Sequence, residues 1–246
     1  MTIAVPARAK LNLDLQVIRR RADGYHEIRT RIQQVELHDL LFIEPVDMAT
    51  SLTVSGLRVD GGDDNSVLKA HAAAEHAAGR KLPARFHLHK RIPPGSGLGG
   101  ASSDAAAALK GLMSIFKLEV ELSRIAADVG SDVPFFINGA AALIEGRGER
   151  VTPVPAIEAW FAIAWPAIEL STADVYTAWD EVKGEGLRQA AEHVEPRIRD
   201  FARRLGSGWT MTGSGSAFFA QTNTRTEAEG AVEGLGCWTA VTRAIK

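Results

Sequence analysis

Apolar and polar residues alternate along the first part of the chain, which predicts strands there. In residues 5–17 every second position is apolar, including Leu11, Leu13, Leu15 and Val17. This is the period of a half-buried strand. A charged turn is expected over 19–24. Segments rich in Val, Leu and Ile and bounded by Pro, Gly or Asp predict further strands over 33–44 and 52–59. Another strand is expected over 85–91, where Phe86 and Leu88 alternate with His or charged residues.

The middle of the chain has the composition of helices. Alanine-rich or periodic segments predict helices over 67–78, 101–116 and 122–129. The polar run from Asp63 to Ser66 offers caps for the first of these helices. Short paired strands are expected over 140–144 and 151–154.

A second series of predicted strands and helices begins beyond Pro155. A strand is expected over 160–165 and helices over 173–182 and 194–205. A strand–turn–strand over 209–221, a helix over 226–234 and a strand over 238–245 complete the chain. This order predicts an α+β protein whose last part is a ferredoxin-like α/β sandwich. We therefore expect two domains, 1–154 and 155–246.

Composition and charge narrow the class of protein. The chain has 246 residues, of which 46% are hydrophobic, and a net charge of −2, values typical of a globular protein without a nucleic-acid or acidic-membrane surface. A single cysteine, Cys237, excludes an internal disulfide framework and fits a reducing compartment. The start of the chain lacks the pattern of a signal peptide. The expected location is the cytoplasm.

A glycine-rich run is the sharpest chemical feature of the sequence. PPGSGLGGASSD at 93–104 follows a predicted strand and leads directly into an alanine-rich helix. Glycines let the backbone come close to a ligand, and the amides at a helix N-terminus attract phosphate. A flexible loop before a capped helix is the alternative, but the strand, the helix and the two serines favour anion binding. The run is neither a Walker A loop nor a strong dinucleotide-binding fingerprint.

Three motifs together carry a resemblance to a known superfamily. PPGSGLGGASSDAA resembles the phosphate-binding motif of the GHMP kinases (galactose, homoserine, mevalonate and phosphomevalonate kinases). PARAKLNL near the start and MTGSGSAFF near the end are similar to the first and third motifs of that superfamily. The resemblance implies a GHMP kinase fold with an N-terminal ribosomal-protein-like β/α domain and a C-terminal ferredoxin-like domain. It also implies ATP and Mg²⁺ as cofactors.

Two further segments indicate the branch of the superfamily. RADGYHE and GSDVPFF are similar to segments of the kinases that phosphorylate the 2-hydroxyl of a methylerythritol unit carrying a cytidine diphosphate, in the non-mevalonate isoprenoid precursor pathway. A homoserine-type or mevalonate-type kinase is one alternative, but it has no use for the Tyr25/His26 pair. A non-catalytic GHMP-fold binding protein is the other, and the retention of Lys10 and Asp132 argues against it. A monomer and a homodimer both remain open.

The resemblance implies two catalytic residues. Asp132, in GSDVPFF, would accept the proton of the acceptor hydroxyl, and Lys10 would place beside it a cation that holds it ionised. By residue type alone, Asp132 could equally cap a turn or helix, and Lys10 could be a solvated surface charge. Asn12 lies two residues after Lys10, so the two side chains share a face if the segment is extended.

The resemblance also implies residues that bind ATP. These are Pro93, Pro94, Gly95, Ser96, Gly97, Leu98, Gly99, Gly100, Ala101, Ser102, Ser103, Asn65 and Lys90. Asn65 could instead cap the helix that follows it. No clear metal ligands stand out, although Ser102 or Ser103 could coordinate the Mg²⁺ that accompanies ATP.

The implied substrate site contains Asn12, Tyr25, His26, Thr172, Tyr176, Gly213 and Ser214. Tyr25 would stack on the cytosine, His26 would hydrogen-bond to it, and Tyr176 would close the stack from the opposite side. A core position for Tyr176 and a hairpin turn at Gly213 are the alternatives.

Overall fold

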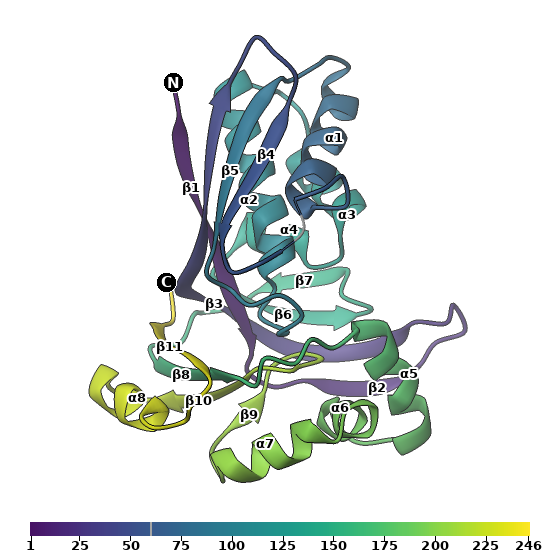
Figure 1. Cartoon of the computed structure of the whole chain (residues 1–246). Helices are drawn as coiled ribbons and strands as arrows, with labels where there is room; N and C mark the ends of the chain where they lie inside the picture. The colour runs from purple at the N-terminus through teal and green to yellow at the C-terminus, as the bar shows by residue number, and fades with distance from the viewer. Residues whose placement is uncertain (60) are drawn as a thin grey trace. The chain divides into compact units, whose positions relative to one another are not determined.

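The computed structural model describes residues 1–59 and 61–246, which form two compact units (Figure 1). Unit 1 consists of Met1–Ala9, His38–Pro94 and Gly99–Gly139, and unit 2 of Lys10–Leu37, Gly95–Leu98 and Ala140–Lys246. Each unit is therefore assembled from segments that are distant in the sequence. The two-domain division at residue 155 remains a prediction.

Unit 1 is built on strands covered by helices. Strand β5 (Ala84–Lys90) is parallel to β4 (Ser51–Gly56) and antiparallel to the second half of β3 (His26–Pro45). The unit also holds the first residues of β1 (Ile3–Asn12). Its helices are α1 (Ser66–Ala78), α2 (Gly100–Phe116), α3 (Leu122–Val129) and α4 (Val133–Asn138).

Helix α2 lies very close to the strands of unit 1. The residues from Ala105 to Ala108 are buried, and a Cβ atom added at Gly111 would lie 2.2 Å from Ile43 Cδ1 on β3. Small side chains along α2 permit this approach, because a larger residue would overlap with the strand. The alanine-rich composition therefore sets the position of the helix that follows the glycine-rich run.

Unit 2 contains a hairpin region and a second sheet. The first half of β3 pairs antiparallel with β2 (Gln16–Arg20) and with β6 (Ala141–Gly146), and β6 pairs with β7 (Arg150–Pro153). The second sheet has the order β11-β8-β10-β9, formed by β8 (Trp160–Trp165), β9 (Thr210–Met211), β10 (Phe218–Thr222) and β11 (Trp238–Arg243). The helices are α5 (Thr172–Val182), α6 (Arg188–Val194), α7 (Arg197–Leu205) and α8 (Arg225–Val232).

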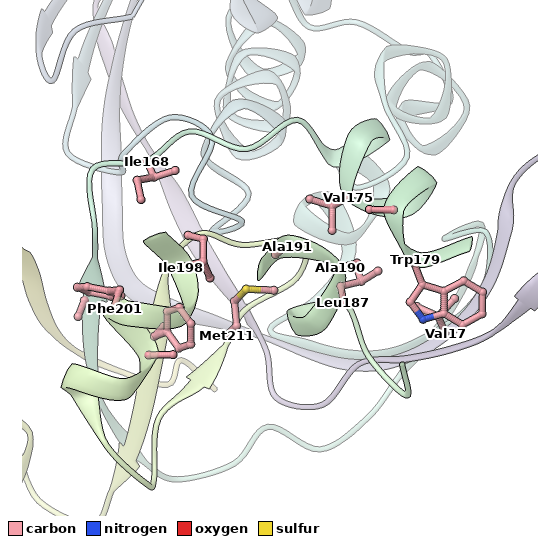
Figure 2. Packing of buried hydrophobic residues seen from close by; sticks show 14 residues of the cluster. Val17, Ile168, Val175, Trp179, Leu187, Ala190, Ala191, Ile198, Phe201 and Met211 are labelled. Atoms are coloured by element: carbon pink, nitrogen blue, oxygen red, sulfur yellow. The ribbon is translucent and has the colours of Figure 1, made fainter. Parts of the chain in front are cut away.

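A hydrophobic core joins three of these helices to the second sheet. Figure 2 shows Trp179 of α5, Ala190 of α6 and Ile198 of α7 within one cluster of buried side chains. Phe201 of α7 packs its ring edge-on against Phe218 of β10, with the ring centroids 5.7 Å apart. The core fixes α5, which carries two of the candidate substrate residues, Thr172 and Tyr176.

The α+β class and most predicted elements are confirmed. The helix over 122–129 and the strand over 160–165 have the expected bounds. The single strand predicted over 5–17 is wrong, because the chain bends between β1 and β2. At this bend Asp14 Oδ1 accepts a hydrogen bond of 2.6 Å from the backbone N–H of Arg31. The apolar alternation continues through the bend and conceals it.

Three helices differ from the prediction. The helix predicted over 194–205 is wrong in its start, since α6 ends at Val194 and α7 begins at Arg197. Pro196 separates them, and the extended backbone of Glu195 (φ −141°, ψ 97°) is what a following proline favours. Helix α4, directly after Asp132, and helix α6 were not predicted. Within residues 1–59 and 61–246, every helix falls short of the length and apolar character needed to cross a membrane.

Candidate functional site

Lys10 and Asn12 lie at the end of β1 and face the same way, as their spacing predicts. Both are buried, with 6% of each residue exposed. Lys10 Nζ donates to Asn12 Oδ1 at 2.5 Å and to the carbonyl oxygen of Gly97 at 2.7 Å. Its ammonium group therefore links the first motif to the glycine-rich run.

Asn12 is held from two further sides. Its backbone N–H donates to Thr212 Oγ1 at 2.9 Å, and its Nδ2 donates to Thr30 Oγ1 at 3.0 Å. Because the amide group donates on one side and accepts from Lys10 on the other, its orientation is fixed. Thr212 and Thr30 were not among the site residues inferred from the sequence, although Thr212 stands in the third motif directly before Gly213.

Four successive carbonyl oxygens of the glycine-rich run are bonded to donors in unit 2. Leu170 N donates to Gly95 O at 3.4 Å, and Ala217 N donates to Ser96 O at 2.9 Å. Lys10 provides the other two donors, its Nζ to Gly97 O and its backbone N–H to Leu98 O at 2.9 Å. Because these carbonyl oxygens accept hydrogen bonds from the protein, their partial negative charges repel a bound anion less.

Glycine is required where the second and third motifs meet. Gly97 has a φ of +79°, and a Cβ atom there would lie 2.4 Å from the carbonyl oxygen of Thr212. Gly213 has a φ of +61°, and its Cβ would lie 3.2 Å from Lys10 Nζ. Residues with a Cβ rarely adopt such φ values. Unit 2 thus brings residues of all three motifs together.

The predicted cytosine pair follows the hairpin turn between β2 and β3. Tyr25 is 57% exposed, and the guanidinium carbon of Arg147 lies over its ring, 5.3 Å from the centroid. Asp23 Oδ1 accepts a hydrogen bond of 3.2 Å from Tyr25 N. Tyr25 therefore presents an aromatic ring at an exposed position, whereas the neighbouring His26 is buried.

His26 is surrounded by three residues of α5. Its ring stacks on Tyr176 with a centroid distance of 5.0 Å and an interplanar angle of 29°. Trp179 packs edge-on at 5.4 Å, and His26 Nε2 lies 3.0 Å from Asp180 Oδ1. Tyr176 was predicted to close a stack on the base; in the structure its ring lies against His26.

The charge environment of Asp180 favours its ionised form. Burial by itself would raise the pKa of Asp180. The hydrogen bond from His26 and the charges of His26, Arg20 and Lys183 outweigh burial and lower the pKa below its ordinary value. Trp179 and Asp180 were missed in the sequence. Their spacing of three and four residues from Tyr176, which places all three on one helix face, is the signal that could have found them.

Thr172 and Ser214, both inferred as substrate residues, are hydrogen-bonded to each other. Their hydroxyl oxygens are 2.9 Å apart. Thr172 is the first residue of α5 and Ser214 follows Gly213 in the third motif. This contact joins the start of α5 to the third motif within unit 2.

The end of the glycine-rich run lies in unit 1 and begins α2. Gly99 is the N-cap with a φ of +75°, and no acidic residue occurs in the first turn. Ser103 is buried and its hydroxyl donates to Gly100 O at 2.9 Å, while Ser102 is half-buried. The first-turn amides of a helix have no partners within the helix, which suits them to an anion.

The two residues predicted near adenine have defined structural contacts in unit 1. Asn65 Oδ1 accepts a hydrogen bond of 3.0 Å from Val67 N and so caps α1. The Lys90 ammonium is buried and donates to Asp39 and to Asp104. The capping alternative for Asn65 is confirmed, and the adenine roles of both residues remain predictions.

Asp132 occupies the N-cap position of α4, with its side chain half-buried. Within the described residues its carboxylate makes no capping hydrogen bond to that helix, so the helix-capping alternative is not supported. Lys110 of α2 donates to Phe136 O at 2.7 Å and ties α4 to α2. Asp132 lies in unit 1 and Lys10 in unit 2, so their expected pairing remains a prediction.

Metal binding by acidic or histidine clusters has no support in residues 1–59 and 61–246. No group of three or more His, Cys, Asp or Glu side chains there could hold a metal ion. The histidines on β5 are engaged elsewhere, since His87 and His89 both lie within hydrogen-bond distance of Ser55 Oγ. The hydroxyls of Ser102 and Ser103 remain the metal-binding candidates.

Comparison with known proteins agrees with this geometry. Residues 65–140 match the model for the GHMP kinases N terminal domain. The chain is 38% identical over 244 residues to the 4-diphosphocytidyl-2-C-methyl-D-erythritol kinase of Thermotoga maritima, covering 86% of this chain and 89% of the relative. It is 36% identical over 249 residues to the kinase of the same name from Shewanella loihica, covering 92% and 87%.

A solved structure extends the likeness to the fold. A crystal structure of 4-(cytidine 5'-diphospho)-2C-methyl-D-erythritol kinase matches with a TM-score of 0.86 at 32% sequence identity, covering 99% of this chain and 100% of that chain. The α+β GHMP kinase fold expected from the three motifs is therefore confirmed.

Proposed function

The chain belongs to the family of 4-diphosphocytidyl-2-C-methyl-D-erythritol kinases, and from this premise we propose how its residues perform the reaction. It is an ATP-dependent phosphotransferase of the non-mevalonate isoprenoid precursor pathway. The acceptor is the 2-hydroxyl of the methylerythritol unit. The acceptor oxygen bonds to the γ-phosphorus of ATP, the bond from that phosphorus to the β–γ bridging oxygen breaks, and ADP leaves.

The glycine-rich run provides the phosphate site. Its carbonyl oxygens at 95–98 are bonded to Leu170, Ala217 and Lys10, which supports a loop that offers amide N–H groups to the phosphates. The N-terminus of α2 adds further amides and the positive end of its dipole. A Cβ atom at Gly97 would overlap with Thr212, so the loop keeps its shape only with glycine there.

Lys10 and Asp132 carry the chemistry of transfer. Asp132 accepts the proton of the acceptor hydroxyl as the new oxygen–phosphorus bond forms. Lys10 supplies positive charge to the reacting groups, which lowers the energy of the developing charge on the transferred phosphoryl group. Asn12 fixes the Lys10 ammonium through the 2.5 Å hydrogen bond. Lys10 thus acts from a defined position rather than from a mobile side chain.

Mg²⁺ is the expected companion of ATP. Bound to the phosphates, it would neutralise charge and orient the γ-phosphate. Serine hydroxyls fit this role, because Ser103 donates its proton to Gly100 O and keeps its oxygen lone pairs available. The chain itself contributes the hydroxyls of Ser102 and Ser103.

The β2–β3 turn and α5 recognise the cytidine. Tyr25 offers an exposed ring on which a base can stack, and His26 offers ring nitrogen atoms that can read its polar edge. The stack of His26 on Tyr176 supports a role of Tyr176 in holding His26 in the required orientation. Thr172 and Ser214, which are bonded to each other, provide hydroxyls for the rest of the substrate.

The observation that carries the proposal is the Lys10 ammonium, bonded to Gly97 of the second motif and to Asn12 of the first. The test is ADP release by the full chain with Mg-ATP and 4-diphosphocytidyl-2-C-methyl-D-erythritol, with mevalonate, homoserine and galactose as alternative acceptors. We expect turnover with the cytidyl substrate alone.

Variants assign the two central roles in the same assay. Asp132→Asn and Lys10→Ala should each lower kcat by about 10²-fold or more. Asp128→Asn, which alters an exposed carboxylate on α3, should leave kcat unchanged. Turnover with another acceptor would contradict the substrate, and full activity of Asp132→Asn would contradict its role as the base.

A further inference from the structure

Three ionisable side chains are buried together in unit 1, outside the residues that the proposed chemistry uses. Asp39 of β3, Lys90 of β5 and Asp104 of α2 are exposed by only 0%, 4% and 2%. Lys90 Nζ donates to Asp104 Oδ2 at 2.7 Å and also to Asp39 Oδ2. Burying such charges costs free energy that their mutual attraction only partly offsets, so the cluster calls for a role other than stability.

Asp39 holds the backbone at the entrance of the glycine-rich run. Its second oxygen, Oδ1, accepts hydrogen bonds from Arg91 N at 2.5 Å and from Ile92 N at 2.8 Å. These two residues follow β5 and immediately precede Pro93. One carboxylate therefore fixes both the last backbone amides before the run and the ammonium of Lys90.

Lys90 and Asp104 hold the exit of the run. Asp104 lies in the second turn of α2 and receives the 2.7 Å hydrogen bond of Lys90. A Cβ atom at Gly100, the first residue of α2, would lie 3.2 Å from Lys90 Nζ and 3.0 Å from Ile92 Cγ2. The start of the helix therefore rests directly on the ammonium group and on the entrance segment.

The charge state of the cluster suits a neighbouring anion. Burial raises the pKa of Asp104 to about 8, against the opposing attraction of Lys90 and with a contribution from Asp39. Burial by itself would lower the pKa of Lys90, but the two carboxylates outweigh it and raise that pKa. Because the Lys90 ammonium lies between the two carboxyl groups and burial favours the protonated form of Asp104, little net negative charge is left next to the N-terminus of α2.

We propose that Asp39, acting with Lys90 and Asp104, is a positioning residue that fixes both ends of the phosphate-binding run so that its amides meet the phosphates of ATP. The inference rests on the proposed function, because it takes the run to be the ATP phosphate site. Phosphate binding depends on amides placed within a few tenths of an ångström. A protein in which these contacts no longer hold the ends of the run would therefore lose affinity for ATP while it remains folded.

The experiment compares Asp39→Ala and Asp39→Asn with Glu44→Gln as a matched control. Glu44 lies on the same strand as Asp39 and forms an exposed ion pair with Arg85 of β5, with an N–O distance of 2.9 Å. We expect Asp39→Ala to raise the KM for ATP about tenfold while the KM for the cytidyl substrate changes less than about twofold. Asp39→Asn should have a smaller effect, since its amide oxygen can still accept from Arg91 and Ile92. Glu44→Gln should behave as the wild type.

A second measurement separates this inference from the proposed function. Binding of a non-hydrolysable ATP analogue by calorimetry reports on the phosphate site without any acceptor. If the wild type binds the analogue but does not phosphorylate the cytidyl substrate, the proposed function fails. The inference can still be tested in that case, because it predicts that Asp39→Ala binds the analogue less tightly than the wild type. If a folded Asp39→Ala binds the analogue as tightly as the wild type, or if both KM values rise equally, the positioning role is wrong.

A variant that preserves volume covers the case in which Asp39→Ala does not fold. The double variant with Asp39→Asn and Lys90→Gln removes both charges and keeps groups that can form hydrogen bonds. We expect it to remain folded and to bind the analogue less tightly than the wild type, because the ammonium that joins the two ends is gone. Wild-type affinity in that folded variant would overturn the inference.

Discussion

The ring of Tyr176 stacks on the ring of His26, with a centroid distance of 5.0 Å. The Nε2 atom of the same histidine lies 3.0 Å from Asp180 Oδ1. An ionised carboxylate can only accept a hydrogen bond, so Nε2 carries the hydrogen of this contact, which leaves Nδ1 as the acceptor of an uncharged imidazole. Under the cytidine-binding role proposed for His26, an acceptor at this position would match the exocyclic amine of cytosine, and Asp180 of α5 would determine which ring nitrogen is available to the base.

Removal of the Tyr176 ring should weaken substrate binding selectively. Tyr176→Ala is expected to raise the KM for the cytidyl substrate about tenfold, because His26 loses the ring that orients it. Tyr176→Phe retains the stack and should remain near the wild type. Steady-state kinetics with each substrate varied in turn provide the measurement. Equal increases in both KM values would mean that Tyr176 serves the fold and not the substrate.

Loss of the Asp180 carboxylate should impair the same recognition by another route. In Asp180→Ala the hydrogen of His26 is free to move to Nδ1, which would turn the acceptor into a donor. We expect the KM for the cytidyl substrate to rise about tenfold at unchanged KM for ATP. Glu181→Gln is the matched control, since the neighbouring Glu181 side chain is 68% exposed. A wild-type KM in Asp180→Ala would exclude this role of the carboxylate.

The sequence predicts elements best where the signal is local. The apolar run of β8 and the periodicity of α3 are contained within a few residues, and both elements have the expected bounds. The bend after β1 depends instead on Asp14 meeting Arg31, a partner on another strand. Helix α4 has six residues, which is too few for periodicity to indicate a helix.

The same distinction holds for the site. The shared face of Lys10 and Asn12 follows from the period of a strand, and their hydrogen bond confirms it. The contact of Gly97 with Thr212 and the cluster of Asp39, Lys90 and Asp104 join segments that only the tertiary structure brings together. The family resemblance placed Lys90 near ATP, and the structure adds that its ammonium is engaged with two carboxylates.

Gly97 should tolerate no side chain. Gly97→Ala forces a φ of +79° on alanine and places a Cβ 2.4 Å from Thr212 O. The combined strain and overlap should lower the free energy of unfolding by about 3 kcal/mol. If the loop is displaced instead, ATP binding should be lost. Gly79→Ala is the control, since Gly79 also has a positive φ, of +63°, but nothing lies within 4 Å of its Cβ. It should cost only about 1 kcal/mol. Denaturant unfolding and ATP-analogue binding test both variants, and equal behaviour would show that the overlap with Thr212 is relieved without cost.

The buried Asp104 should make stability depend on pH. Its pKa is raised from 3.8 to about 8 in the folded chain, chiefly by burial. The folded state therefore holds a proton that the unfolded state releases over this range. Its contribution to stability is fully present below the unfolded pKa and is lost as the pH rises through the folded pKa. Asp104→Asn imitates the protonated carboxyl and removes the titration.

The Tm of Asp104→Asn relative to the wild type should accordingly rise as the pH increases from about 5 to about 8. Lys90 and Asp39 are the charged groups that act on Asp104. The size of the change in Tm difference therefore shows how far burial, which raises the pKa of Asp104, outweighs the Lys90 ammonium, which lowers it. Asp128→Asn, at an exposed position of the same unit, should show no such trend. A difference in Tm that instead stays constant between about pH 5 and about pH 8 would mean that Asp104 is already ionised in the folded chain over this range, because neither state would then exchange a proton there. The attraction of Lys90 would then exceed the effect of burial, and the cluster would carry a net negative charge next to the start of α2.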